Sequence, residues 1–109
     1  MNDAASVRDF AVNEKRRRIL HCVDQVLENL GSDVRRALTY YMRRESNLKH
    51  YEIPDKPHDF ALALRRVFGS SSGGIESQIV ELIVREFHLR TDSAQSFEKA
   101  VGLALSEGS

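Results

Sequence analysis

The centre of this chain reads Ile53-Pro54-Asp55-Lys56-Pro57 … Phe60 … Val67-Phe68-Gly69 … Ile75-Glu76, and this stretch decides the fold. Each proline keeps the residue before it out of helical geometry, so the segment leading to Pro57 is predicted to be a loop. Pro57 itself suits the first turn of a helix, where its missing N–H costs nothing. A buried stripe then runs from Phe60 to Phe68, and Gly69 ends it. The stretch therefore predicts a loop, a helix, a stop, and a new helix from about Ile75.

Apolar residues at helical spacing predict two helices before this stretch. The first is expected over residues 13–29, with Gly31 just beyond its end, because glycine enters left-handed backbone geometry without steric cost. Ser32 is expected to cap the second helix, and Asp33 is favourable at its positive N-terminal end. The short connection predicts that these two helices form an antiparallel hairpin.

Two helices are predicted after the central stretch. The fourth is strongly apolar, and a weaker fifth is marked by Phe97, Val101 and Leu105. No alternating run is long enough for a strand. The expected fold class is all-α, a single compact bundle of four to five helices with a proline loop before helix three. A closed five-helix bundle and a four-helix core with a mobile last helix both fit. The side chains expected to be buried in the first four helices are Ile19, Cys22, Val23, Val26, Leu27, Leu30, Val34, Ala37, Leu38, Tyr41, Met42, Phe60, Leu64, Val67, Phe68, Ile75, Ile79, Leu82, Ile83 and Phe87, with Ala61, Leu62 and Ala63 filling gaps.

Composition places the chain among soluble globular proteins. Its 109 residues suit one domain, with 41% hydrophobic and 29% charged residues. Residues 1–12 lack sustained periodicity and are expected to be flexible, and residues 13–106 form the single helical domain. Cys22 has no second cysteine to pair with, which predicts a reducing compartment. No apolar run approaches the roughly 18 residues of a membrane span, and the N-terminus lacks a secretory h-region. The expected location is the cytoplasm, with no membrane partner.

The arginines are one candidate site, for nucleic acid. Residues 14–66 carry 12 Lys and Arg against 8 Asp and Glu, a net charge of +4, whereas residues 67–109 carry 3 against 6, a net of −3. Paired arginines on facing helices can clamp phosphates or a duplex backbone. The competing interpretation is that they solvate outer helix faces, as exposed Lys and Arg ordinarily do. The candidate nucleic-acid residues are Arg16, Arg17, Arg35, Arg36, Arg43 and Arg44.

The broad apolar surface of the fourth helix is a second candidate site, for self-association. A helix that is apolar on more than one side is either central in its domain or part of an oligomer interface. If the chain is a monomer, some of these residues are simply core. The residues predicted to form a homodimer interface are Ile79, Val80, Ile83, Val84 and Phe87.

The residue types that carry catalysis do not occur here in recognisable patterns. The four histidines include no His-x-x-x-His pair, and Cys22 has no Cys-x-x-Cys partner, so metal-ligand spacing is absent. The Ser/Gly run at residues 69–74 lacks the signature of a phosphate-binding loop and a strand before it. The sequence thus predicts no enzyme, no cofactor, no metal and no identifiable small-molecule substrate. An enzyme would need a pocket that gathers His, Cys or acids from distant helices.

A family resemblance adds to these patterns. Its elements are His21 … Asp24 … Leu27 … Leu30-Gly31, Tyr40-Tyr41, Ile53-Pro54-Asp55-Lys56-Pro57-His58-Asp59-Phe60 and Val67-Phe68-Gly69 … Ile75-Glu76 … Ile79. Over about residues 19–88 the chain resembles the Nitrosopumilus-type output domain of archaeal signalling proteins. It departs from that pattern at Ser71-Ser72, where the family has Gly-Ala. The resemblance implies a small archaeal cytoplasmic helical module with a role in signalling, and it carries over no catalytic positions.

Taken together, the residues and the resemblance predict a non-enzymatic interaction or output module that acts through protein–protein contacts, with a partner protein or with itself as a homodimer. The alternative is a small nucleic-acid-binding regulator that uses the paired arginines of the first two helices. Salt-dependent affinity for DNA distinguishes the alternative, because each neutralised phosphate releases counterions.

Overall fold

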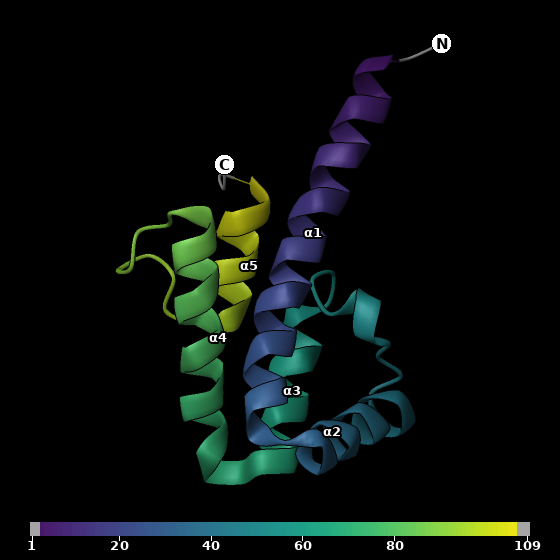
Figure 1. The fold of residues 1–109 in the computed structure, drawn as a ribbon, viewed down its shortest axis with the longest axis vertical. Helices are drawn as coiled ribbons and strands as arrows, with labels where there is room; N and C mark the ends of the chain where they lie inside the picture. Colours follow the sequence, from purple (N-terminus) through teal and green to yellow (C-terminus); the bar gives the residue numbers. More distant parts are fainter. Residues whose placement is uncertain (1–2, 107–109) are drawn as a thin grey trace.

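The computed structural model describes the backbone of residues 3–106 and the side chains of residues 10–106. The described residues form helices and no strand, which confirms the predicted all-α bundle (Figure 1). Two short 3-10 turns, η1 and η2, join some of the helices. The elements are α1 (Asp3–Leu30), α2 (Ser32–Glu45), η1 (His50–Glu52), α3 (Pro57–Phe68), η2 (Gly69–Ser71), α4 (Ser72–Phe87) and α5 (Phe97–Ser106).

The first helix is longer than its apolar stripe. α1 begins at Asp3, ten residues before the predicted start at residue 13, and its N-terminal half projects beyond the other helices (Figure 1). No glycine or proline interrupts residues 3–30, so nothing in the local sequence stops the helix. Phe10 on this projection is 69% exposed. The predicted flexibility of residues 1–12 stays a prediction, and residues 1 and 2 lie outside the described part.

The turn between α1 and α2 differs from its prediction in two ways. Gly31, with φ 109°, takes the place before the first turn of α2, and no side chain caps this end, so Ser32 is not the cap. Residues with a Cβ rarely adopt such a φ, which accounts for the glycine. α2 does not lie along α1 but leads away to one side from the lower end of α1 (Figure 1). The predicted antiparallel hairpin is therefore wrong, because the single residue Gly31 is shorter than the roughly two to five residues that join antiparallel helices.

The proline loop and the glycine stop agree with the sequence. α3 begins at Pro57, and Gly69 ends it with φ 59° while its N–H bonds to the Arg65 carbonyl. The next helix starts earlier than expected, at Ser72 rather than near Ile75. Gly73 and Gly74 are thus part of the first turn of α4.

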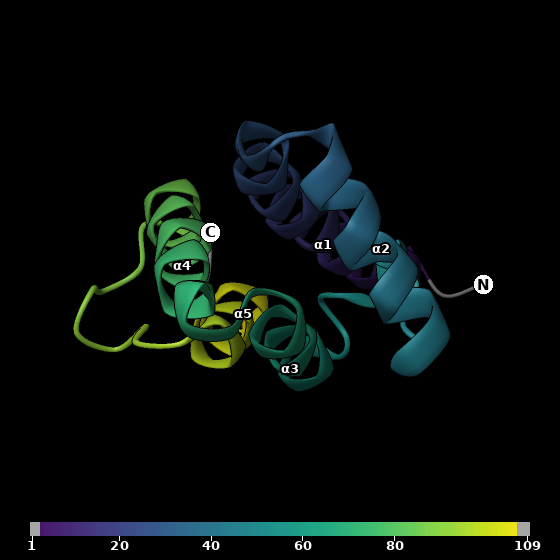
Figure 2. The same cartoon turned by 90° about the horizontal axis from the view of Figure 1, so that it is seen from below.

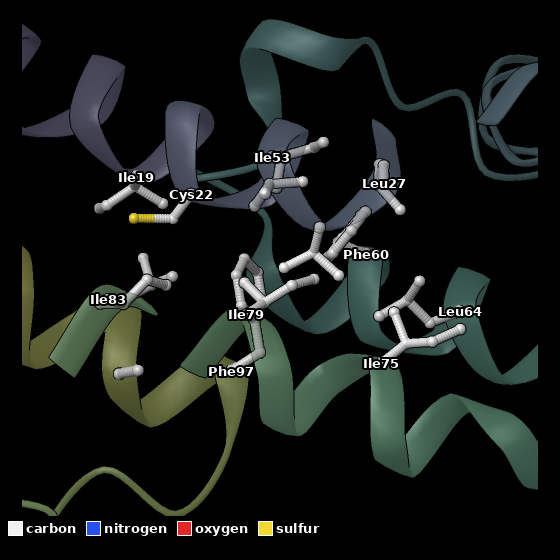
Figure 3. Packing of buried hydrophobic residues seen from close by; sticks show 14 of the residues in the cluster. Ile19, Cys22, Leu27, Ile53, Phe60, Leu64, Ile75, Ile79, Ile83 and Phe97 are labelled. Atoms are coloured by element: carbon white, nitrogen blue, oxygen red, sulfur yellow. The ribbon is translucent and has the colours of Figure 1, made fainter. Parts of the chain in front are cut away.

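The core lies between α1, α3, α4 and α5, and α2 with the loop after it closes one side. Phe60, Ile79 and Phe97 meet near its centre (Figure 3), and the rings of Phe60 and Phe97 are 5.1 Å apart. Ala37 and Leu62 were predicted to be buried but are exposed. The core side chains are Ile19, Cys22, Val23, Val26, Leu27, Leu38, Met42, Leu48, Ile53, Phe60, Ala63, Leu64, Ile75, Ile79, Ile83, Phe87, Ala94, Phe97, Ala100, Val101 and Ala104.

The fifth helix belongs to this core. Phe97, Ala100, Val101 and Ala104 of α5 are buried against the other helices. In the described structure the bundle is the closed five-helix form, one of the two arrangements that the sequence left open.

Candidate interaction surfaces

The first candidate is the outer side of α2, here called the α2 face: Arg36, Thr39, Tyr40, Arg43 and Arg44. These residues are three, four, seven and eight positions apart, so they project from one side of the helix. The opposite side buries Leu38 and Met42, which hold α2 on α1 and α3. Burial of the inner stripe therefore fixes which residues of α2 face solvent.

Tyr40 is the apolar centre of the α2 face. Its side chain is 63% exposed, and the guanidinium carbon of Arg44 lies 5.8 Å from its ring centroid. The five residues surround a surface hollow of about 490 Å³. The Thr39 hydroxyl donates back to the Arg35 carbonyl over 2.9 Å, so it is already engaged within the helix. Tyr40 belongs to the Tyr40-Tyr41 pair of the family resemblance but was not predicted to be part of a binding surface, although its spacing from Arg36, Arg43 and Arg44 could have revealed the face.

The charge of the α2 face is uncompensated over the described part of the chain. No described carboxylate forms an ion pair with Arg36, Arg43 or Arg44, whereas Arg35 beside them lies 3.9 Å from Glu28. Tyrosine and arginine are among the residue types enriched at protein–protein interfaces and at their energetic hot spots.

Three of the six candidate nucleic-acid arginines, Arg16, Arg17 and Arg35, are engaged in ion pairs with carboxylates of the same chain. Arg16 of α1 is 24% exposed, donates to Asp55 over 2.6 Å and to the Tyr51 carbonyl over 3.1 Å, and so holds the proline loop. Arg17 pairs with Glu14 at 3.2 Å. Arg36, Arg43 and Arg44 are the members that share the α2 face.

The second candidate lies over α4 and the loop that follows it. This α4 hollow measures about 440 Å³. Half-buried Val80 and Val84 supply its apolar surface, and Glu76 and Glu81 supply carboxylates. Its lining residues are Gly73, Glu76, Ser77, Val80, Glu81, Val84, Thr91, Ala94 and Gln95.

The residues of the predicted homodimer interface divide into core residues and residues that line the α4 hollow. Ile79, Ile83 and Phe87 are buried in the core of the single chain, at 1% exposure or less. Val80 and Val84 reach the surface and line the α4 hollow. Self-association through α4 stays a prediction, and within this fold these two valines are the members of the set that a partner can touch.

Glu76 has a structural role beside this hollow. Its Oε2 accepts the backbone N–H of Phe97 over 2.8 Å, which satisfies an otherwise free donor at the start of α5. Glu81 is exposed and forms no ion pair with any described residue. Sequence spacing could not reveal the Glu76 contact, because 21 residues separate its two members.

Titratable groups elsewhere serve the fold. Cys22 is buried, and desolvation by burial raises its pKa to about 11, helped by the charge of Glu86 and opposed by that of Arg18. Arg18 donates to Glu86 over 2.8 Å and lies 4.3 Å from the ring centroid of Phe87, which joins α1 to α4. Within residues 10–106, no group of three or more His, Cys, Asp or Glu side chains is placed to hold a metal ion.

Two further findings bear on function. Among the described helices, none combines the length and the apolar character needed to cross a membrane. The chain matches no protein-family model, no curated protein and no solved structure. The resemblance to an archaeal output domain therefore stays a prediction, and the two surfaces are the structural basis for a proposed function.

Proposed function

We propose that the protein is a non-enzymatic interaction module that binds an acidic segment of a partner protein through the α2 face. The observation that carries the proposal is Tyr40, which is 63% exposed among three arginines that have no ion pair with the described residues. The aromatic ring offers apolar contact area at little entropic cost, and the guanidinium groups offer paired hydrogen bonds to carboxylates.

An acidic protein fits this surface better than a nucleic acid does. The whole chain has a formal net charge of zero, and Asp33 and Glu45 lie near the two ends of α2. A duplex backbone carries one charge per about 1.7 Å, so its binding favours a longer and purely basic stripe. Arg16, which the nucleic-acid alternative also requires, already pairs with Asp55. These features favour a short acidic segment with an apolar residue that packs on Tyr40.

A role in cytoplasmic archaeal signalling is part of this proposal and is supported by the sequence resemblance alone. In such a role the bundle would hold the α2 face rigid, because α2 is anchored by Leu38 and Met42. A preorganised surface loses less conformational entropy on binding than a flexible one.

The test is a binding titration with two probes. One is a fluorescein-labelled synthetic peptide of glutamates interspersed with leucine and phenylalanine, and the other is a labelled random-sequence DNA duplex. We expect the peptide to bind with a dissociation constant below about 100 μM at low salt. Tyr40→Ala combined with Arg43→Gln should weaken that binding at least about tenfold. The matched control, Arg65→Gln with Arg66→Gln, removes two exposed arginines from α3 and should leave the peptide affinity unchanged.

Two results would overturn the proposal. Peptide affinity that is equal in the α2 variant and the α3 control would show that net charge, and not the α2 face, attracts the peptide. DNA binding that is tighter than peptide binding, falls steeply with salt and disappears in the α2 variant would replace the proposal with the nucleic-acid alternative.

A further inference from the structure

We propose that the α4 hollow receives the α2 face of a second copy of this chain, so that copies associate head to tail. The inference rests on the proposed function and specifies it: the acidic segment that the α2 face binds is a surface of the chain itself. The two surfaces are complementary in charge, since one carries arginines that form no ion pair with a described residue and the other carries Glu76 and Glu81.

The apolar parts of the two surfaces also correspond. The α4 hollow is lined by half-buried Val80 and Val84 and by polar Thr91 and Gln95. A tyrosine is suited to such a site, because its ring packs on the valines and its hydroxyl bonds to a polar rim. Tyr40 is the exposed aromatic residue at the centre of the α2 face.

The arginines on either side of Tyr40 match the carboxylates of the hollow. Arg36 precedes Tyr40 by one helical turn and Arg43 follows it by nearly one, so both flank the ring on the same side of α2. Glu76 and Glu81 both line the hollow that would receive the ring. Glu81 forms no ion pair with a described residue, and Glu76 uses Oε2 for the Phe97 N–H, which leaves its Oε1 able to accept.

The fold keeps these surfaces apart within one chain. Figure 2 shows α2 at one end of the molecule and α4, with the loop after it, at the opposite end. The contact must therefore form between copies, and each copy uses a different surface for each neighbour. Such a heterologous contact produces open chains or closed rings rather than a two-fold dimer. A two-fold contact of α4 with α4 would instead place carboxylates near carboxylates.

The surfaces are small, so the association should be weak and sensitive to salt. We would measure the average mass by sedimentation equilibrium from about 10 to 500 μM chain, a range that covers weak affinities. We expect the mass to rise above that of one chain with concentration at about 50 mM salt, and to return towards one chain at about 500 mM.

Charge exchange tests which residues pair. Arg43→Glu and Glu81→Arg should each reduce the association constant at least about tenfold, because each places like charges together. An equimolar mixture of the two variants should associate again, since every contact between unlike copies then joins opposite charges. Arg66→Glu is the matched control for Arg43→Glu and should associate like the unaltered chain. Circular dichroism verifies that each variant remains folded.

The outcomes separate this inference from the proposed function. A chain that stays monomeric across the whole concentration range overturns the head-to-tail contact, while peptide binding to the α2 face still supports the proposed function. Single variants that lose association, with a mixture that does not regain it, also overturn the contact. Two results together support the head-to-tail contact and the proposed function. The Tyr40→Ala variant should lose both self-association and peptide binding, and the Glu81→Arg variant should lose self-association alone.

Discussion

At the scale of single residues, several exposed charged groups hold distant segments together. His50 Nε2 donates to Asp24 Oδ1 over 2.8 Å, which ties the η1 turn to α1. This hydrogen bond to Asp24, together with the carboxylate charge, raises the pKa of His50 above 6.5, while desolvation and Arg35 act in the opposite direction. The proline loop is thus held from two sides, by Arg16 through Asp55 and by Asp24 through His50.

The His50–Asp24 pair should make stability depend on pH. The pKa of His50 is higher in the folded state than in the unfolded state, where it is 6.5. The stabilisation is therefore complete at pH values below 6.5 and is lost as the pH rises through the folded-state pKa. The imidazole is about half exposed, so we expect the pair to contribute only about 0.5 kcal/mol to the free energy of unfolding. Urea unfolding at pH 5.5 and pH 8.5 should show this loss in the unaltered chain and not in Asp24→Asn. An equal pH dependence in both would contradict the assignment.

Cys22 should be inert in the folded protein. Its side chain is 3% exposed, and burial raises its pKa to about 11, so little thiolate forms near neutral pH. We expect alkylation by iodoacetamide at pH 8 to be at least about a hundredfold slower in buffer than in urea. Mass spectrometry over time measures both rates. Rapid modification without urea would show that the packing of α1 on α4 opens readily.

At the scale of elements, the helices differ in how their positions are determined. α3 is bounded by local signals, Pro57 at its start and Gly69 at its end. α5 has weaker local signals, and its placement depends on buried Phe97 and on the bond from the Phe97 N–H to Glu76. The placement of α5 therefore depends on residues elsewhere in the chain.

The Glu76 contact should stabilise α5 measurably. Glu76→Ala leaves the Phe97 N–H without its acceptor, and we expect a loss of about 1 kcal/mol, as for other removed helix caps. Backbone amides of α5 should exchange with solvent faster than in the unaltered chain, which hydrogen-exchange NMR would detect. Glu76→Gln keeps an acceptor oxygen and is the matched control. Unchanged exchange in Glu76→Ala would mean that packing alone holds α5.

At the scale of the whole molecule, one core joins helices from both ends of the chain. Phe60 of α3 and Phe97 of α5 are fully buried, with ring centroids 5.1 Å apart (Figure 3). On the outside, the basic α2 face and the acidic α4 hollow are held at opposite ends by this packing (Figure 2). The core thus determines both the stability of the fold and the separation of the two surfaces.

Removing one of the central rings should affect the whole fold. We expect Phe97→Ala to lower the free energy of unfolding by about 3–5 kcal/mol. This is a large part of the total free energy of unfolding of a typical domain, which is about 5–15 kcal/mol. Leu62→Ala, at a side chain that is 37% exposed, should cost under about 1 kcal/mol and serves as the control. Urea denaturation followed by circular dichroism measures both. Similar losses in the two variants would contradict a core centred on Phe60 and Phe97.

The local features of the fold could be predicted from the sequence. Most of the apolar stripes of α1, α3 and α4 are buried as expected, although Leu30, Val67, Phe68 and Leu82 are only partly buried, and the proline loop and Gly69 bound α3 as expected. These features depend on residues within about one helical turn of each other, whose interactions are the same wherever the segment lies. Predictions at helix ends were less accurate: α1 extends to Asp3, and Ser32 is not a cap.

By itself, the sequence determined that the chain is all-α, which stripes are buried and where α3 starts and stops. Only the tertiary structure decided that α2 leads away from α1, that Ile79, Ile83 and Phe87 are core while Val80 and Val84 line a hollow, and which of the arginines share a face. Contacts such as Arg16 with Asp55 and Arg18 with Glu86 join residues 39 and 68 positions apart. Periodicity describes one helix at a time, whereas these contacts depend on how helices pack on one another.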